Sequence, residues 1–112
     1  MASLQFVIPK LVASALPIET VAAKARAANI DRPRLENKER HAGGHARITC
    51  QSPMARFLID LVRVVAGRAA TKGETNLVIA CGLAVDAAMT AIEQCKRDGG
   101  AAPASHVEKT PY

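Results

Sequence analysis

Nine consecutive apolar residues, Leu77–Val85, constrain the fold of this chain more than any other feature. As a helix, this run is apolar on every side, so every side must be covered. A chain of 112 residues offers one partner helix and an N-terminal segment, which leave part of the run uncovered. The run therefore either forms the centre of the domain or packs against a second copy of the chain.

We favour a homodimer, because small residues such as Ala80 and Ala84 permit close helix approach. The predicted oligomer interface comprises Leu77, Ile79, Gly82 and Leu83. Short apolar runs also suit buried strands. The alternative is that residues 77–81 form such a strand, with Gly82 turning into a helix that begins at Leu83.

Helical spacing dominates the second half of the chain. Ser52 suits an N-cap and Pro53 the first helical turn, and a buried stripe with a three-and-four spacing follows them. A break at residues 71–74 separates this helix from the next. The sequence thus predicts an antiparallel helical hairpin, about 53–70 and 76–97, on which an N-terminal helix around Pro17–Ala28 packs.

The predicted fold class is mainly α, a small all-alpha domain spanning residues 1–100. Residues 31–47 mix basic and acidic side chains with a proline and a glycine pair, which indicates a charged, partly mobile connector. Short strands near 4–8 and 45–50 are compatible with the pattern. Residues 101–112 are expected to form a disordered tail.

Composition excludes several function classes. Hydrophobic residues make up 49% of the chain, but 22 residues are alanine, so the core must be thin. Aromatic residues make up 3%, which argues against an aromatic-lined pocket or a base-stacking platform. We find no nucleophile elbow, phosphate loop or dinucleotide fingerprint, so we expect neither an enzyme nor a bound cofactor.

The net charge of +5 is unevenly distributed. Residues 1–74 carry 12 basic and 6 acidic side chains, whereas residues 75–112 carry 3 and 4. Arginines on one side of a molecule could contact phosphates or acidic protein surfaces. The candidate residues for binding a protein partner or nucleic acid are Arg32, Arg34, Lys38, Arg40, Arg47, Arg56 and Arg63.

The residues that most nearly match a metal-binding pattern are His41, His45 and Cys50. Imidazole and thiolate are good zinc ligands, but Gly43 and Gly44 oppose the helix that would align the two histidines. We therefore rank a metal site below the binding functions. The three cysteines are an odd number without a close pair, which indicates reduced thiols and a cytoplasmic location.

No membrane contact is expected, because the longest unbroken apolar run is far shorter than the roughly 20 residues of a membrane-spanning helix. The most economical interpretation is a small non-catalytic regulator, adaptor or inhibitor that binds a larger protein assembly. The alternative is a nucleic-acid-binding, transcriptional regulator that uses the arginines and lysines of residues 32–72.

Overall fold

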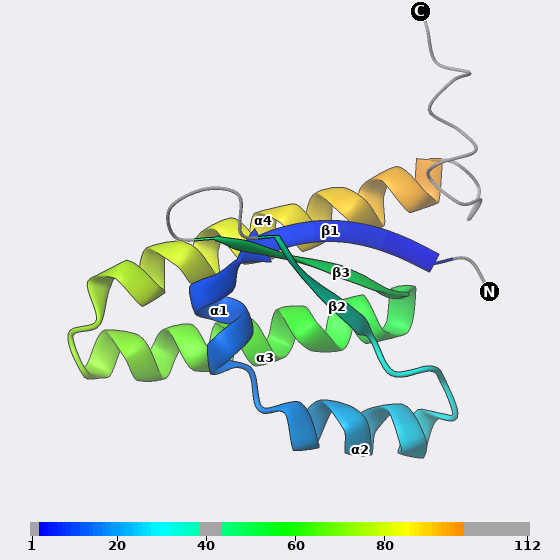
Figure 1. The fold of residues 1–112 in the computed structure, drawn as a ribbon, viewed down its shortest axis with the longest axis horizontal. Helices are drawn as coiled ribbons and strands as arrows, with labels where there is room; N and C mark the ends of the chain where they lie inside the picture. Colours follow the sequence, from blue (N-terminus) through cyan, green and yellow to red (C-terminus); the bar gives the residue numbers. More distant parts are fainter. Residues whose placement is uncertain (1–2, 39–43, 98–112) are drawn as a thin grey trace, which may run out of the picture.

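A computed structural model describes residues 3–38 and 44–97, and the following statements concern those residues (Figure 1). One strand, two short helices and two further strands precede the two long helices. In order, the elements are β1 Ser3–Pro9, α1 Lys10–Ala15, α2 Ile18–Ala28, β2 Arg34–Lys38, β3 His45–Gln51, α3 Ser52–Thr71 and α4 Thr75–Arg97.

The three strands form one antiparallel sheet in the order β1-β3-β2. Leu4 of β1 lies opposite Cys50 of β3, and Leu35 of β2 lies opposite Ile48. Alternate residues of β1 and β3 are buried, as period-2 geometry requires of a sheet with one covered face. β1 and β3 therefore each supply one row of side chains to the core and another to the open face of the sheet.

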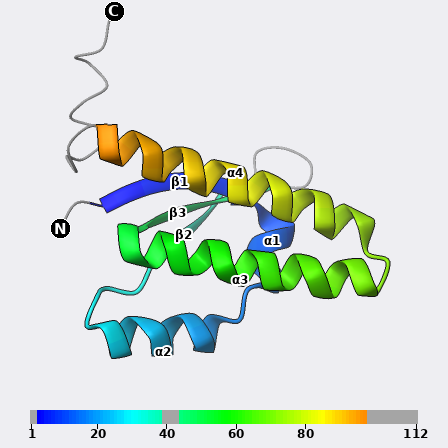
Figure 2. The ribbon, with the colours of Figure 1, turned by 180° about the vertical axis from the view of Figure 1, so that it is seen from behind.

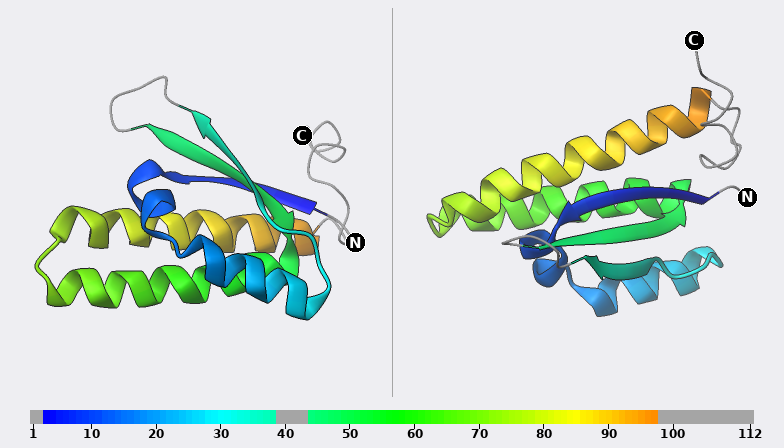
Figure 3. Two further views of the ribbon diagram at one scale, coloured as in Figure 1. Left: turned by 60° about the horizontal axis from the view of Figure 1, so that its bottom comes forward. Right: turned by 45° about the horizontal axis from the view of Figure 1, so that its top comes forward.

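The helices lie in a single layer against one face of this sheet. α3 and α4 form an antiparallel hairpin, and α2 flanks α3 beneath β2, as seen from behind in Figure 2. Figure 3 shows that no described element covers the opposite face of the sheet. The domain is consequently a two-layer α/β sandwich with an open sheet face.

The prediction of an all-alpha helical domain was wrong, because a three-stranded sheet forms one of the two layers. The segments near 4–8 and 45–50 do form strands, β1 and β3, which pair with each other across a long stretch of chain. The proposed connector at 31–47 was also wrong in part, since it contains β2 and the start of β3. Arg34 and Glu36 belong to this edge strand, and both are exposed.

α2, α3 and α4 lie close to the positions expected for helices, whereas α1 was not predicted. α2 ends at Asn29, whose left-handed φ of 57° suits a helix stop. α4 is helical from Thr75 onward, so the strand alternative for residues 77–81 was wrong. Ser52 is the first residue of α3 and caps nothing; its hydroxyl instead lies 4.0 Å from Cys95 Sγ. The tail at 101–112 lies outside the described residues.

Small residues let the two layers approach closely. Ala46 in β3, Ala55 in α3 and Ala84 in α4 are all buried. Larger side chains fill the remaining space, and Leu4, Ile48 and Met54 are among the least exposed. The alanine content read from composition thus serves close packing between helices and sheet.

Candidate functional site

The side of the α3–α4 hairpin that faces away from the sheet carries a charged groove. Its volume is about 350 Å³. The charged side chains that line it are Arg56, Asp60 and Arg63 from α3 and Glu93 and Lys96 from α4. Because the two helices run antiparallel, residues near 60 come to lie beside residues near 90 (Figure 2).

Helix periodicity explains how α3 presents its charges together. Arg56, Asp60 and Arg63 are spaced four and three residues apart, which places them on one face of the helix. All three are exposed, whereas Ile59 and Ile92 between the helices are buried. The groove therefore combines an apolar floor with side chains of both charges, the usual make-up of a protein-binding surface.

The sequence predicted only one side of this groove. No sequence pattern linked Glu93 of α4 to Arg56 or Arg63 of α3. Neither Met89 nor Lys96 was among the binding residues predicted from the sequence. Combining the predicted hairpin with helix periodicity would have found them, since antiparallel helices of similar length place their two open ends together.

An apolar area occupies the other end of α4, near the turn of the hairpin. Ile79 and Leu83 are 60% and 57% exposed, although both are large aliphatic residues. They lie one helical turn apart, and a Cβ added at Gly82 between them would meet no atom within 4 Å. Leu77, the fourth residue of the predicted interface, instead packs against the core and is half-buried.

The remaining basic candidates lie on other surfaces. Arg34 and Arg47 belong to strand positions on the open face of the sheet, where Arg47 pairs with Glu36 at 3.6 Å. Arg32 lines a cavity between α2 and β2. Lys38 ends β2, and Arg40 lies outside the described residues. The seven predicted binding residues therefore do not form one basic platform.

The residues with potential for catalysis or metal binding do not converge. His45 is exposed and Cys50 is buried, because an odd separation along β3 puts them on opposite faces. His41 lies outside the described residues. Within residues 3–38 and 44–97, no three metal-ligating side chains gather.

Two of the three cysteines are unsuited to nucleophilic chemistry. All three are free and buried. Burial raises the pKa of the Cys50 thiol from 9.0 to about 12 and also raises the pKa of the Cys81 thiol. Since the thiolate is the reactive form, both thiols are held in the unreactive state at neutral pH.

α4 is long and apolar enough to cross a membrane by length and composition. Its most apolar 18-residue window has a mean hydropathy of 1.6, and 28% of that window is buried. The sequence prediction considered only unbroken apolar runs and so missed the window that continues past Asp86. Length and composition do not separate a membrane span from a core helix, and α4 packs six buried residues into the domain.

Comparisons with known proteins found no relative from which a function could be transferred. The chain matches no protein-family model, no curated protein and no solved structure. The surfaces described above are therefore the basis on which a function can be proposed.

Proposed function

We propose that this protein is a homodimeric, non-catalytic binding protein that acts through the outer face of the α3–α4 hairpin. The exposed apolar residues of α4 near the turn of the hairpin join two copies, and the charged groove at the other end of the hairpin captures a protein partner. The observation that carries the proposal is the exposure of Ile79 and Leu83 on a helix that is apolar all round at this end.

Exposed apolar residues are common one at a time, so their arrangement matters more than their number. Ile79 and Leu83, four residues apart, belong to one ridge of the helix, and Gly82 leaves open space beside them. A two-fold axis through this area would bring the same residues of a second copy into contact, with the space at Gly82 receiving a side chain of the partner.

The charged groove suits a protein better than a nucleic acid. It carries Arg56, Arg63 and Lys96 but also Asp60 and Glu93, so a phosphate backbone would meet carboxylates as well as cations. A protein surface with both charge signs can complement such a pattern. The other arginines lie on separate surfaces and so do not form one basic area, which further disfavours the nucleic-acid alternative.

Sedimentation velocity tests the dimer. We expect the wild-type chain to sediment as a dimer at micromolar concentration and Ile79→Glu to sediment as a folded monomer. Ile18→Glu on α2 is the matched control, because Ile18 is 61% exposed and Ile79 is 60% exposed. A monomeric wild-type protein, or an Ile79→Glu variant that remains dimeric, would contradict this part of the proposal.

Affinity capture from an extract of the native host, after nuclease treatment, tests the groove. We expect the double variant Arg56→Glu, Arg63→Glu to lose a protein that the wild-type chain captures. Arg34→Glu on the sheet should retain it. Loss by both variants, or by neither, would refute the assignment of the groove. Capture that disappears with nuclease alone would favour the nucleic-acid alternative.

A further inference from the structure

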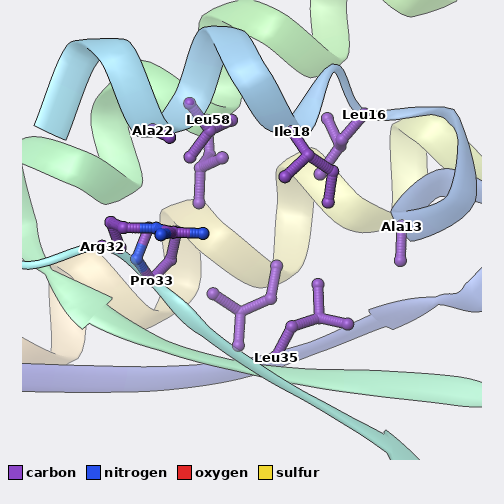
Figure 4. Close-up of a pocket in the computed structure, with 10 residues that line it drawn as sticks. Ala13, Leu16, Ile18, Ala22, Arg32, Pro33, Leu35 and Leu58 are labelled. Atoms are coloured by element: carbon purple, nitrogen blue, oxygen red, sulfur yellow. The ribbon is translucent and has the colours of Figure 1, made fainter.

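We propose that the cavity between α2 and β2 binds a small aliphatic carboxylate, with the alkyl chain inside and the carboxylate on Arg32. The site is separate from the hairpin face, so it does not depend on the proposed protein contacts. Figure 4 shows the side chains that surround the cavity.

The interior of the cavity is apolar. Leu16 approaches from the segment that leads into α2, Leu58 from α3 and Leu35 from β2 (Figure 4). Val21 of α2 and Ile48 of β3 also line the cavity. Leu35 is 43% exposed even though its strand position faces the core, because α2 does not close over it completely. The space therefore offers van der Waals contacts to an alkyl chain and few hydrogen bonds to water.

Arg32 is the one charged side chain among the residues that line this cavity. In the close-up its guanidinium nitrogens lie between Leu58 and Leu35, toward the middle of the lining side chains (Figure 4). Within the described part of the chain, no carboxylate forms an ion pair with it. A guanidinium binds a carboxylate through two parallel hydrogen bonds, which makes that group its best-matched ligand.

The size of the cavity limits the ligand. Its volume is about 220 Å³. Sites for drug-sized ligands occupy about 300–1,000 Å³, so this cavity takes a smaller molecule. At about 30 Å³ for each water-sized group, the space holds about seven such groups. An unbranched chain of six to eight carbons, with its carboxylate at the mouth, fits this volume.

The outer wall of the cavity is α2, and a ligand enters when this helix moves outward. α2 buries only Val21 and Ala25, whereas α3 buries six residues. Lys24 holds α2 to α3 by lying 5.4 Å from the centre of the Phe57 ring, a contact that costs little to break. A small outward shift of α2 would therefore admit a ligand without disturbing the rest of the domain.

NMR titration of the full chain with hexanoate, octanoate and decanoate tests the proposal. We expect saturable shifts of the Leu16, Val21 and Ile48 amide signals, with the tightest binding at six to eight carbons. Octan-1-ol, which has the chain but no charge, should bind at least about tenfold more weakly, because it cannot form a charge-assisted bond with the arginine. Equal binding of octanoate and octan-1-ol would overturn the role of Arg32.

Two variants separate the charge from the cavity. Arg32→Gln should weaken octanoate binding about tenfold or more, whereas Arg34→Gln, the same change on the open sheet face, should leave it unchanged. Ala22→Leu should fill the cavity and abolish octanoate binding, and its NMR spectrum shows whether the domain is folded. If this variant does not fold, the comparison of Arg32→Gln with Arg34→Gln tests the site. Absence of binding, or shifts confined to Ile79 and Leu83, would refute the site.

Discussion

The two edge strands of the sheet, β1 and β2, differ in how completely the helices cover them. β1 pairs with β3 along seven residues and is packed against α4, and its Leu4 is completely buried. β2 pairs with β3 along five residues at the opposite edge, and its Leu35 is 43% exposed beneath α2. Both leucines occupy core-facing positions, so the difference arises from the helix above each strand.

This contrast indicates which part of the molecule contributes most to the free energy of folding and which part opens locally. The β1–β3 sheet with α3 and α4 contains nearly all of the fully buried large side chains. α2 and β2 cover less apolar surface and enclose the cavity at Arg32. Local opening is cheapest where few apolar contacts are lost, so ligand entry is expected on the β2 side.

The largest expected effect compares the two leucines directly. Leu4→Ala should lower the free energy of unfolding by about 3 kcal/mol, because it leaves a cavity in the packed half. Leu35→Ala should lower it by about 1 kcal/mol or less, because solvent already reaches that side chain. Urea unfolding followed by circular dichroism measures both. Equal losses would show that the two halves are packed alike.

The buried thiol of β3 allows a second test of the packed half. The pKa of Cys50 rises from 9.0 to about 12 on folding, so the folded state holds this proton more tightly than the unfolded chain does. The resulting stability is fully present below pH 9 and is lost as the pH rises toward 12. At about pH 10.5 the loss amounts to about 2 kcal/mol.

The Cys50→Ala variant isolates this contribution. Because it lacks the thiol, its free energy of unfolding should fall about 2 kcal/mol less than that of the wild type between about pH 8 and about pH 10.5. Urea titrations at the two pH values provide the measurement. An identical fall in both proteins would mean that water reaches Cys50 in the folded state.

The packed half was also more predictable from sequence than β2, because its two long helices were expected and its strands were named as compatible with the pattern. α3 and α4 show helical spacing over about twenty residues each, which local pattern detects. β2 has the sequence Arg-Leu-Glu-Asn-Lys, with a single apolar residue, so no local pattern marks it as a strand. It exists because β3 offers it hydrogen bonds and because Leu35 reaches the core side.

Non-local contacts account for what was missed at the candidate sites. The α3 side of the hairpin groove followed from the spacing of Arg56 and Arg63, but Lys96 joins them only through the antiparallel packing of α4. The cavity at Arg32 draws its walls from α1, α2, β2, β3 and α3. A surface assembled from so many separate segments leaves no signature in any one of them.

The smallest expected effect tests whether α2 opens independently of the packed half. Asn29 ends α2 with φ 57°, a conformation that an alanine adopts at a cost of about 1 kcal/mol. The amide of Ile30 donates to the Ala25 carbonyl oxygen at 3.0 Å and completes this stop. Asn29→Ala should therefore destabilise the end of α2, and Asn29→Gly should not.

Native-state hydrogen exchange reports where that cost appears. If α2 opens locally, Asn29→Ala should speed exchange of its last-turn amides about fivefold, the equivalent of about 1 kcal/mol. The amides of α3 should be unaffected, because they exchange through opening of the packed half. Faster exchange in both helices would mean that α2 unfolds only with the whole domain. In that case a ligand could enter the Arg32 cavity only through fluctuations of the entire fold, and binding of octanoate would be correspondingly slow.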